Sequence, residues 1–280
     1  MRRALGWLAV LSLWGCTKGP GPDSDHELLV FAGASLRDAL TAVARDFERE
    51  PPTTTVYFSF AGSNALARQL MAAPRADVFV SASEAWMDRV ERAGVIEPGS
   101  RRALLGNQLV VVVNRDVNLR LGHVCDLLDA DLDHLALGDP GAVPAGVYAR
   151  EYLEGIDCPG GRNAWASLNS KVIPTPDVRA ALAQAEASRS VAAFVYRTDA
   201  AVSSRVRVAL TIGTMEGPRI VLPVALVRGH TGRTAQRFLA HLESPVAARV
   251  FEQHGFVAFE PDTARTNTTL AQAPTTSASH

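Results

Sequence analysis

Short apolar runs alternate with amphipathic segments along most of the chain. The runs are rich in Val, Leu and Phe, and the segments after them repeat apolar residues every three or four positions, which is helical spacing. Strands are predicted at 28–31, 53–60, 76–82, 108–114, 134–139, 191–196, 205–212 and 220–227. Helices are predicted at 35–47, 64–73, 84–94, 146–155, 177–187 and 234–244. This alternation is typical of βαβ units, so we expect an α/β fold on mostly parallel sheets.

Two of the predicted strand-to-helix turns share one sequence order. The run ending at Phe31 is followed by small residues and then Ser35, and "FSFAGSNAL" repeats this order with Ser63. One interpretation is a capping box, in which Ser35 and Asp38 satisfy free N–H groups. The other is an anion site, because a helix N-terminus has unpaired N–H donors and ligands bind beyond the carboxyl ends of strands. The second turn at Ser63 favours the anion site.

Two further helix starts and one strand end offer hydrogen-bond donors. In "GDPGAVPAGVYAREYL" Pro144 fits the first turn of a helix, because its missing N–H would have no partner there. In "IPTPDVRAAL" we expect Thr175 as the N-cap and Pro176 as the first helical residue. The backbone N–H groups of Ala145 and Val178 would then be unpaired donors. "VAAFVY" ends a strand in Tyr196, whose phenol can donate a hydrogen bond.

Composition narrows the class of protein. The length of 280 residues fits one large domain or two lobes, and the formal net charge of −1 gives no sign of a nucleic-acid surface. The sequence contains no G-x-S-x-G, P-loop, H-E-x-x-H or Cys/His cluster, so we expect no catalytic residue, no cofactor and no protein-bound metal ion. A secreted hydrolase that uses Ser35 as its nucleophile stays open as a reading from another class.

The N-terminal segment predicts export. Arg2 and Arg3 precede an apolar stretch, 4–14, that is too short to span a bilayer. The following "LWGC" resembles a bacterial lipobox, which predicts a signal peptide at 1–15 and lipidation of Cys16, with ordinary signal-peptide cleavage as the alternative. We expect a flexible tether at 16–26 and a disordered tail at 261–280. Outside the cytoplasm a disulfide between Cys125 and Cys158 is possible, but the spacing alone does not decide it.

Nine stretches, taken in order, resemble one known family. They lie between about residues 28 and 259 and are "VFAGASL", "FAGSNALARQL", "ADVFVSASEAWMD", "LLGNQLVVVVN", "LGDPGAVPAGVYAREYL", "TPDVRAAL", "FVYRTDA", "LPVALV" and "AARVFEQHGF". The sequence is similar to the periplasmic molybdate-binding proteins of bacterial ABC importers, the ModA family of type II periplasmic binding proteins. Gly62 departs from the pattern, since a serine is common at that position in the family.

The resemblance implies a fold, a ligand and a set of site residues. It implies a two-lobed protein with lobe 1 at 27–107 and 222–260, lobe 2 at 108–221, and the ligand in the cleft between them. Molybdate, with tungstate as a second ligand, would be bound by two serines, two backbone amides and a tyrosine. By motif these positions are Ser35, Ser63, Ala145, Val178 and Tyr196. The implied partner is the membrane permease of an ABC importer, and we expect a monomer in the periplasm or cell envelope.

Other ligands and other roles for neighbouring residues also stay open. Within the same class the alternative ligand is another tetrahedral oxyanion, sulfate or phosphate. A ligand-sensing domain of a regulator is a third reading, which the export signal and the lack of a DNA-binding helix pair disfavour. Arg179 and Arg197 adjoin proposed ligand positions, but we expect them to face solvent or to pair with surface acids.

Overall fold

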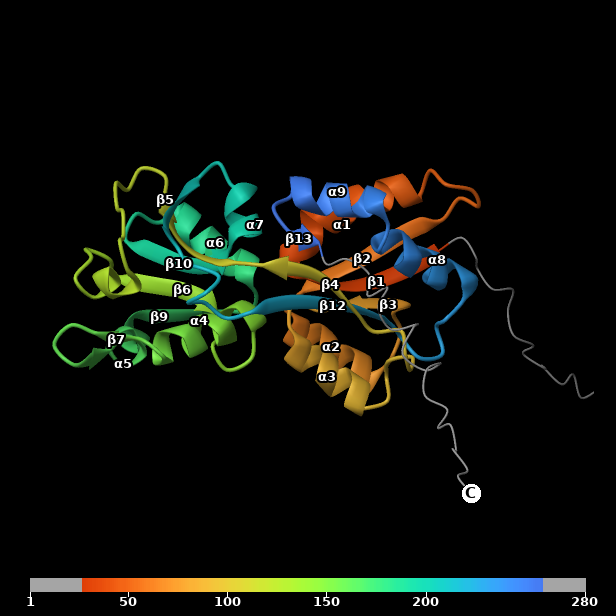
Figure 1. The fold of residues 1–280 in the computed structure, drawn as a ribbon, viewed down its shortest axis with the longest axis horizontal. Coiled ribbons are helices and arrows are strands. Elements are labelled where there is room, and N and C mark those ends of the chain that lie inside the picture. Colours follow the sequence, from red (N-terminus) through yellow and green to blue (C-terminus); the bar gives the residue numbers. More distant parts are fainter. Residues whose placement is uncertain (1–26, 259–280) are drawn as a thin grey trace, which may run out of the picture.

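Two lobes lie side by side, each built on one β-sheet with helices on both of its faces (Figure 1). The structure is a computed structural model and describes residues 27–258. The signal peptide, the tether, the lipidation site at Cys16 and the C-terminal tail are predictions that lie outside the described residues. The prediction of a two-lobed α/β fold is confirmed.

The sheet of the first lobe combines both ends of the described chain. Its strands follow the order β13-β4-β12-β3-β1-β2. They are β1 (Glu27–Gly33), β2 (Thr55–Ala61), β3 (Val78–Val80), β4 (Arg102–Asn107), β12 (Ile220–Leu226) and β13 (Val257–Ala258). β1 pairs in parallel with β2 and β3, so the turns that follow these strands open at one edge of the sheet.

The sheet of the second lobe comes from one continuous part of the chain. Its strands follow the order β11-β5-β10-β6-β9. They are β5 (Leu109–Asn114), β6 (His134–Gly138), β9 (Val172–Thr175), β10 (Val191–Tyr196) and β11 (Val206–Thr211). A separate hairpin of β7 (Asp157–Cys158) and β8 (Arg162–Asn163) lies at the end of this lobe that is far from the first lobe (Figure 1).

Both sheets are mixed, so the prediction of mostly parallel sheets is wrong in this respect. Within residues 27–258, four strand pairs of the two sheets are parallel and five are antiparallel. The reason is the path between the lobes. The chain leaves the first lobe through β4 and β5, with Gln108 between them, and returns through β11 and β12. Outgoing and returning strands lie next to each other in both sheets, as β4–β12 and β5–β11, and therefore run in opposite directions.

Helices cover both faces of each sheet (Figure 1). In the first lobe α1 (Arg37–Phe47), α8 (Arg233–Leu242) and α9 (Pro245–Gln253) lie on one face, with α2 (Ser63–Ala72) and α3 (Glu84–Arg92) on the other. In the second lobe α4 (Pro144–Glu154) and α5 (Ala164–Leu168) lie opposite α6 (Val178–Ala187) and α7 (Arg197–Ala201). This cover explains the unbroken apolar runs of β5 and β10, which are buried on both faces. Within residues 27–258 no helix has the length and apolar composition needed to cross a bilayer.

Candidate functional site

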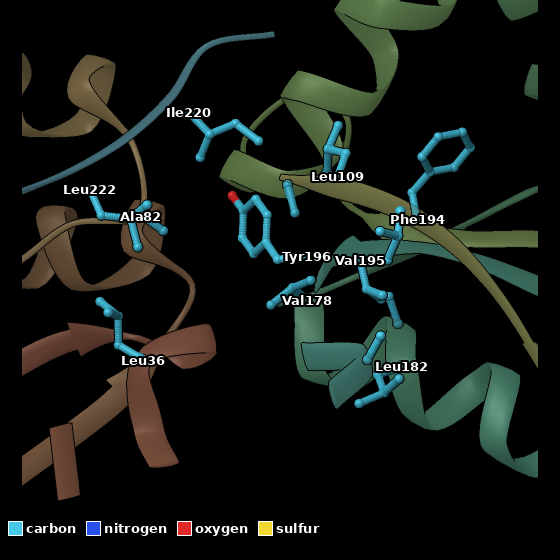
Figure 2. Packing of buried hydrophobic residues seen from close by; sticks show 14 of the residues in the cluster. Leu36, Ala82, Leu109, Val178, Leu182, Phe194, Val195, Tyr196, Ile220 and Leu222 are labelled. Atoms are coloured by element: carbon cyan, nitrogen blue, oxygen red, sulfur yellow. The ribbon is translucent and has the colours of Figure 1, made fainter. Parts of the chain in front are cut away.

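A small cavity lies between the lobes, where strands of both sheets end. Both lobes contribute to its lining. All five predicted site residues are part of that lining: Ser35, Ser63, Ala145, Val178 and Tyr196. Figure 2 shows the Tyr196 ring at the junction of the lobes, with Leu36 and Ala82 on the side of the first lobe and Val178 on the side of the second.

Ser35 reaches the cavity from the turn after β1. The turn is a short 3-10 helix, Ala34–Leu36, which leads into α1. The Ser35 side chain is 2% exposed, and its Oγ has no hydrogen-bond partner within the described residues. No side-chain capping bond forms at this helix start, so the alternative of a capping box with Asp38 is wrong. Burying a hydroxyl without a hydrogen-bond partner costs free energy of folding. A ligand bound in the cavity would supply the partner that the Ser35 hydroxyl lacks among the described residues.

Ser63 is the first residue of α2 and lies beside the Ser35 turn. Gly33 and Ala61 are paired at the ends of β1 and β2, so the two turns begin next to each other. The Ser63 Oγ accepts a hydrogen bond from the backbone N–H of Ala82 at 2.8 Å. Because that bond uses the oxygen as acceptor, the hydroxyl proton is free to be donated to a ligand.

The start of α4 presents the N–H of Ala145. Pro144 is the first helical residue, as predicted, and Ala145 follows it, so its N–H has no partner inside the helix. The first turn of α4 packs directly against the end of β6, because Gly146 of the helix and Gly138 of the strand meet there. A Cβ on Gly146 would lie 1.7 Å from the carbonyl oxygen of Gly138, which only glycine avoids.

α6 begins two residues later than the sequence predicted. Asp177 is the N-cap and accepts from the N–H of Ala180 at 2.9 Å, whereas Thr175 ends β9 and donates to the carbonyls of Leu137 and Asp177. The predicted cap at Thr175 is therefore wrong, because the carboxylate two residues on takes that role. Val178 becomes the first residue of α6, and its N–H is again one without a partner inside the helix.

Tyr196 ends β10, and its side chain is 1% exposed. Its hydroxyl, like that of Ser35, has no hydrogen-bond partner within residues 27–258. Burial raises the pKa of this phenol well above its usual value, and Tyr148 and Asp199 raise it further. The group is therefore a neutral hydroxyl at physiological pH, able to donate to an anion.

Among the described residues, the cavity lining contains hydrogen-bond donors but no positively charged side chain. Within the described residues the lining holds no lysine, arginine or histidine, and no group of three or more potential metal ligands exists in that part of the chain. The single charged residue is Asp177, one of whose carboxylate oxygens is already used as the cap of α6. The site can therefore bind an anion through hydroxyl and amide dipoles but offers no metal-binding cluster.

Contacts across the cavity mark the structure as a closed arrangement of the lobes. Trp86 of α3 donates from its indole Nε1 to the carbonyl of Ala142 in the second lobe at 2.8 Å. Tyr148 of α4 interacts with the side chain of Ser83 in the first lobe, while burial raises its pKa to about 12. Both contacts join one lobe to the other and therefore depend on the lobes lying together.

Sequence patterns did not single out the close approach at Gly62. This residue lines the cavity, and a Cβ on it would lie 2.7 Å from the backbone carbonyl oxygen of Pro176 in the other lobe and 2.5 Å from Oδ1 of Asn64. A side chain at this position would hold the lobes apart. Gly62 is thus a point at which the two lobes come close together.

We expect Gly62→Ala to weaken ligand binding by about 1–3 kcal/mol, the usual cost of inserting a methyl group into a filled space. The contact with the Pro176 backbone arises only in the closed arrangement, whereas the Asn64 side chain must move aside in either state, so thermal unfolding of the ligand-free protein is measured beside the affinity. Gly232→Ala is the matched control, because nothing lies within 4 Å of a Cβ there. Equal affinities of both variants and the unmodified protein would contradict the assigned role.

We expect Ser35→Ala and Tyr196→Phe each to lower affinity by about 1.5–3 kcal/mol without lowering the stability of the ligand-free protein. Each change removes a hydroxyl that has no hydrogen-bond partner among the residues that the structure describes. Ser63→Ala is the contrasting variant, because it also leaves the Ala82 N–H unpaired and should cost stability as well as affinity. Calorimetry for binding and thermal unfolding for stability separate the two patterns; unchanged affinity in Ser35→Ala and Tyr196→Phe would remove both hydroxyls from the site.

Cys125 and Cys158 form a disulfide whose Cα atoms are 5.6 Å apart. The bond joins a 3-10 turn, Val124–Leu128, to β7, at the far end of the second lobe (Figure 1). Neither cysteine lines the cavity. The bond therefore concerns the stability of the second lobe rather than the contacts of a ligand.

Comparisons with known proteins agree with this fold. Residues 28–257 match the model of the family described as bacterial extracellular solute-binding protein. The chain is 36% identical over 261 residues to the molybdate-binding protein ModA of Escherichia coli, covering 91% of this chain and 98% of that protein. Among solved structures it resembles the periplasmic molybdate-binding protein of Azotobacter vinelandii, with a TM-score of 0.69, 20% identity and coverage of 82% and 98%. It also resembles the sulfate-binding protein SubI of Mycobacterium tuberculosis, with a TM-score of 0.71, 19% identity and coverage of 84% and 88%. The two structural likenesses bear on the fold alone.

Proposed function

Because the chain belongs to the bacterial extracellular solute-binding proteins, and within them to the molybdate-binding ModA family, we propose that it captures molybdate and tungstate for an ABC importer. Proteins of this family bind solutes and are not enzymes. The proposed ligand set is the hydroxyls of Ser35, Ser63 and Tyr196 with the backbone N–H groups of Ala145 and Val178.

The observation that carries the proposal is the pair of buried hydroxyls, on Ser35 and Tyr196, that face one cavity without a partner in the described part of the chain. Molybdate is a fully deprotonated dianion at neutral pH, so each of its oxygens needs donors and none needs an acceptor. Fixed hydroxyl and amide dipoles can supply donors from several directions. Each such bond to a charged ligand contributes about 1.5–3 kcal/mol.

Size is the proposed basis of selection among tetrahedral anions. Sulfate and phosphate are smaller than molybdate and tungstate, so they would leave some of the five donors without a good contact. Hydrogen phosphate also carries a proton that needs an acceptor, and the carboxylate of Asp177 in the lining could accept it. Phosphate is therefore the second candidate ligand. The hydrolase alternative lacks support, because Ser35 Oγ has no base within hydrogen-bond distance among residues 27–258.

The proposed setting is the bacterial cell envelope. Solute-binding proteins of this family act outside the cytoplasm, and a disulfide in the chain fits an oxidising compartment. We propose that Cys16 is lipidated and holds a monomer at the membrane surface, within reach of the permease. Labelling with a radioactive fatty acid, in parallel with Cys16→Ser, tests the anchor, and loss of label only in the variant is the expected result.

Calorimetry of anion-free protein with molybdate, tungstate, sulfate and phosphate tests the ligand. We expect one site, tight binding of molybdate and tungstate, and binding of sulfate and phosphate that is weaker by about a hundredfold or more, the equivalent of one or two lost charge-assisted bonds. A phosphate or sulfate affinity equal to that of molybdate would overturn the proposal. Turnover of ester or phosphoester substrates would favour the enzyme.

A further inference from the structure

Arg179 joins two carboxylates that belong to different lobes. Its Nε donates to Oδ1 of Asp199 at 2.5 Å, and its Nη2 donates to Oδ2 of Asp38 at 2.6 Å. Asp199 is fully buried in the second lobe, whereas the Asp38 side chain, in the first lobe, is 42% exposed. The expectation that Arg179 pairs with surface acids is therefore wrong for Asp199. Neither Arg179 nor either acid lines the cavity.

Each member of this trio is tied to an element that carries a proposed ligand group. Asp38 lies on α1, in the first turn after the Ser35 turn. Arg179 directly follows Val178 on α6. Asp199 lies on α7, and its Oδ2 accepts from the backbone N–H of Tyr196 at 3.3 Å. The trio thus connects the supports of three ligand positions, one in the first lobe and two in the second.

The two bonds of Arg179 differ in what they require. The bond to Asp199 lies within the second lobe, where a buried carboxylate needs a cation or donors to remain ionised. Burial raises the pKa of Asp199 to about 6, and Arg179 is the main group that opposes this rise. The bond to Asp38 crosses between the lobes, so it forms only when the lobes are closed.

We propose that Arg179 is a positioning residue that latches the closed state through Asp38, and that this latch slows release of the bound anion without touching it. Asp199 fixes the guanidinium in place, so little side-chain freedom is lost when Asp38 arrives. The inference rests on the proposed binding of an anion between the lobes.

A direct charge effect predicts the opposite outcome. Asp38 brings a negative charge near the site of a dianion, so its removal should strengthen binding if only long-range electrostatics mattered. If instead the bond is a solvent-exposed pair of no consequence, its removal should change nothing. If Asp38 latches the closed state, its removal should speed release of the anion, because the open state becomes easier to reach. The rate at which the anion enters the open cleft should not change.

The experiment is stopped-flow mixing of the full exported chain with molybdate, followed by intrinsic fluorescence. Trp86 donates to Ala142 across the lobes, so its emission should report closure. In Asp38→Asn we expect the release rate to rise roughly three- to tenfold, the range of a well-oriented but partly exposed ion pair, while the association rate stays within about twofold. Asp38→Glu restores the carboxylate and should bring release back to within about twofold of the unmodified protein.

Asp116→Asn is the matched control. It removes the same charge from a pair, with Arg189, that has the same 2.6 Å separation but lies wholly within the second lobe. Its kinetics should equal those of the unmodified protein. Unchanged or slower release in Asp38→Asn, or equally fast release in Asp38→Glu, would overturn the latch. Absence of molybdate binding to the unmodified protein would overturn the proposed function instead, so the two failures are distinguishable.

Discussion

Saturating molybdate is expected to make the protein measurably more compact in small-angle X-ray scattering and to raise its melting temperature. Sulfate at the same concentration should do neither strongly. The proposed donors come from both lobes, Ser35 and Ser63 from the first and Ala145, Val178 and Tyr196 from the second. Only the closed state brings all five around one anion.

The expected size of this effect follows from the contacts that the open state lacks. Without an anion, helix N-termini with partial positive charge face each other across the cleft, and two buried hydroxyls have no partner among residues 27–258. A ligand shifts an equilibrium only by its difference in affinity for the two states. Two or three bonds that exist only on closure give several kcal/mol, on the order of a hundredfold or more in the closed population.

The control for closure is the double variant Ser35→Ala/Tyr196→Phe, which keeps the fold but lacks two donors. It should show the same scattering as the ligand-free protein at a molybdate concentration that saturates the unmodified chain. Identical scattering of the unmodified protein with and without bound molybdate would contradict the two-lobe mechanism even where calorimetry shows binding.

Reduction of the bond between Cys125 and Cys158 is expected to cost about 3–4 kcal/mol of unfolding free energy. The cysteines are 33 residues apart, and the loop-entropy model gives this amount for a loop of that length. Because the bond lies far from the cavity, affinity for molybdate should change by less than about threefold. Thermal unfolding with and without reductant, on a chain that starts after Cys16, measures the effect.

A second route to the same measurement avoids the reductant. Cys125→Ser/Cys158→Ser should melt at the same temperature as the reduced protein and bind molybdate as the oxidised protein does. Titration of free thiols in denatured, unreduced protein checks the bond itself, because no other cysteine remains once Cys16 is absent. Two reactive thiols would contradict the disulfide.

Local sequence was sufficient for most of the architecture. The eight predicted strands recur as β1, β2, β3, β5, β6, β10, β11 and β12, and the six predicted helices recur as α1, α2, α3, α4, α6 and α8, because apolar periodicity reports which faces are buried. The strands β4 and β9 of the two sheets and the short helices α5 and α7 were not predicted. Strand direction was not predictable in this way. β4 and β12 are neighbours only because the chain leaves and re-enters the first lobe there, which depends on contacts between residues more than a hundred positions apart.

Local sequence likewise predicted one part of the site and not another. Small residues before Ser35 and Ser63, and Pro144 before Ala145, are local signals of helix starts that can bind an anion. The distance from Gly62 to Pro176 and the bond from Arg179 to Asp38 carry no such signal, because each joins two lobes whose closure no single segment encodes. The cap of α6 was misplaced for a smaller reason, since Thr175 and Asp177 are both good capping residues and only the backbone path chooses between them.

The path between the lobes makes the second lobe an inserted unit. Asn107, where the chain leaves the first lobe, is paired directly with Ile220, where it returns. A short loop joining these two neighbours would close the first-lobe sheet without the inserted segment, and the segment would keep its own sheet and its disulfide. If both polypeptides fold, the donors of the two lobes would lie on separate chains, and anion capture would become an anion-dependent dimerisation.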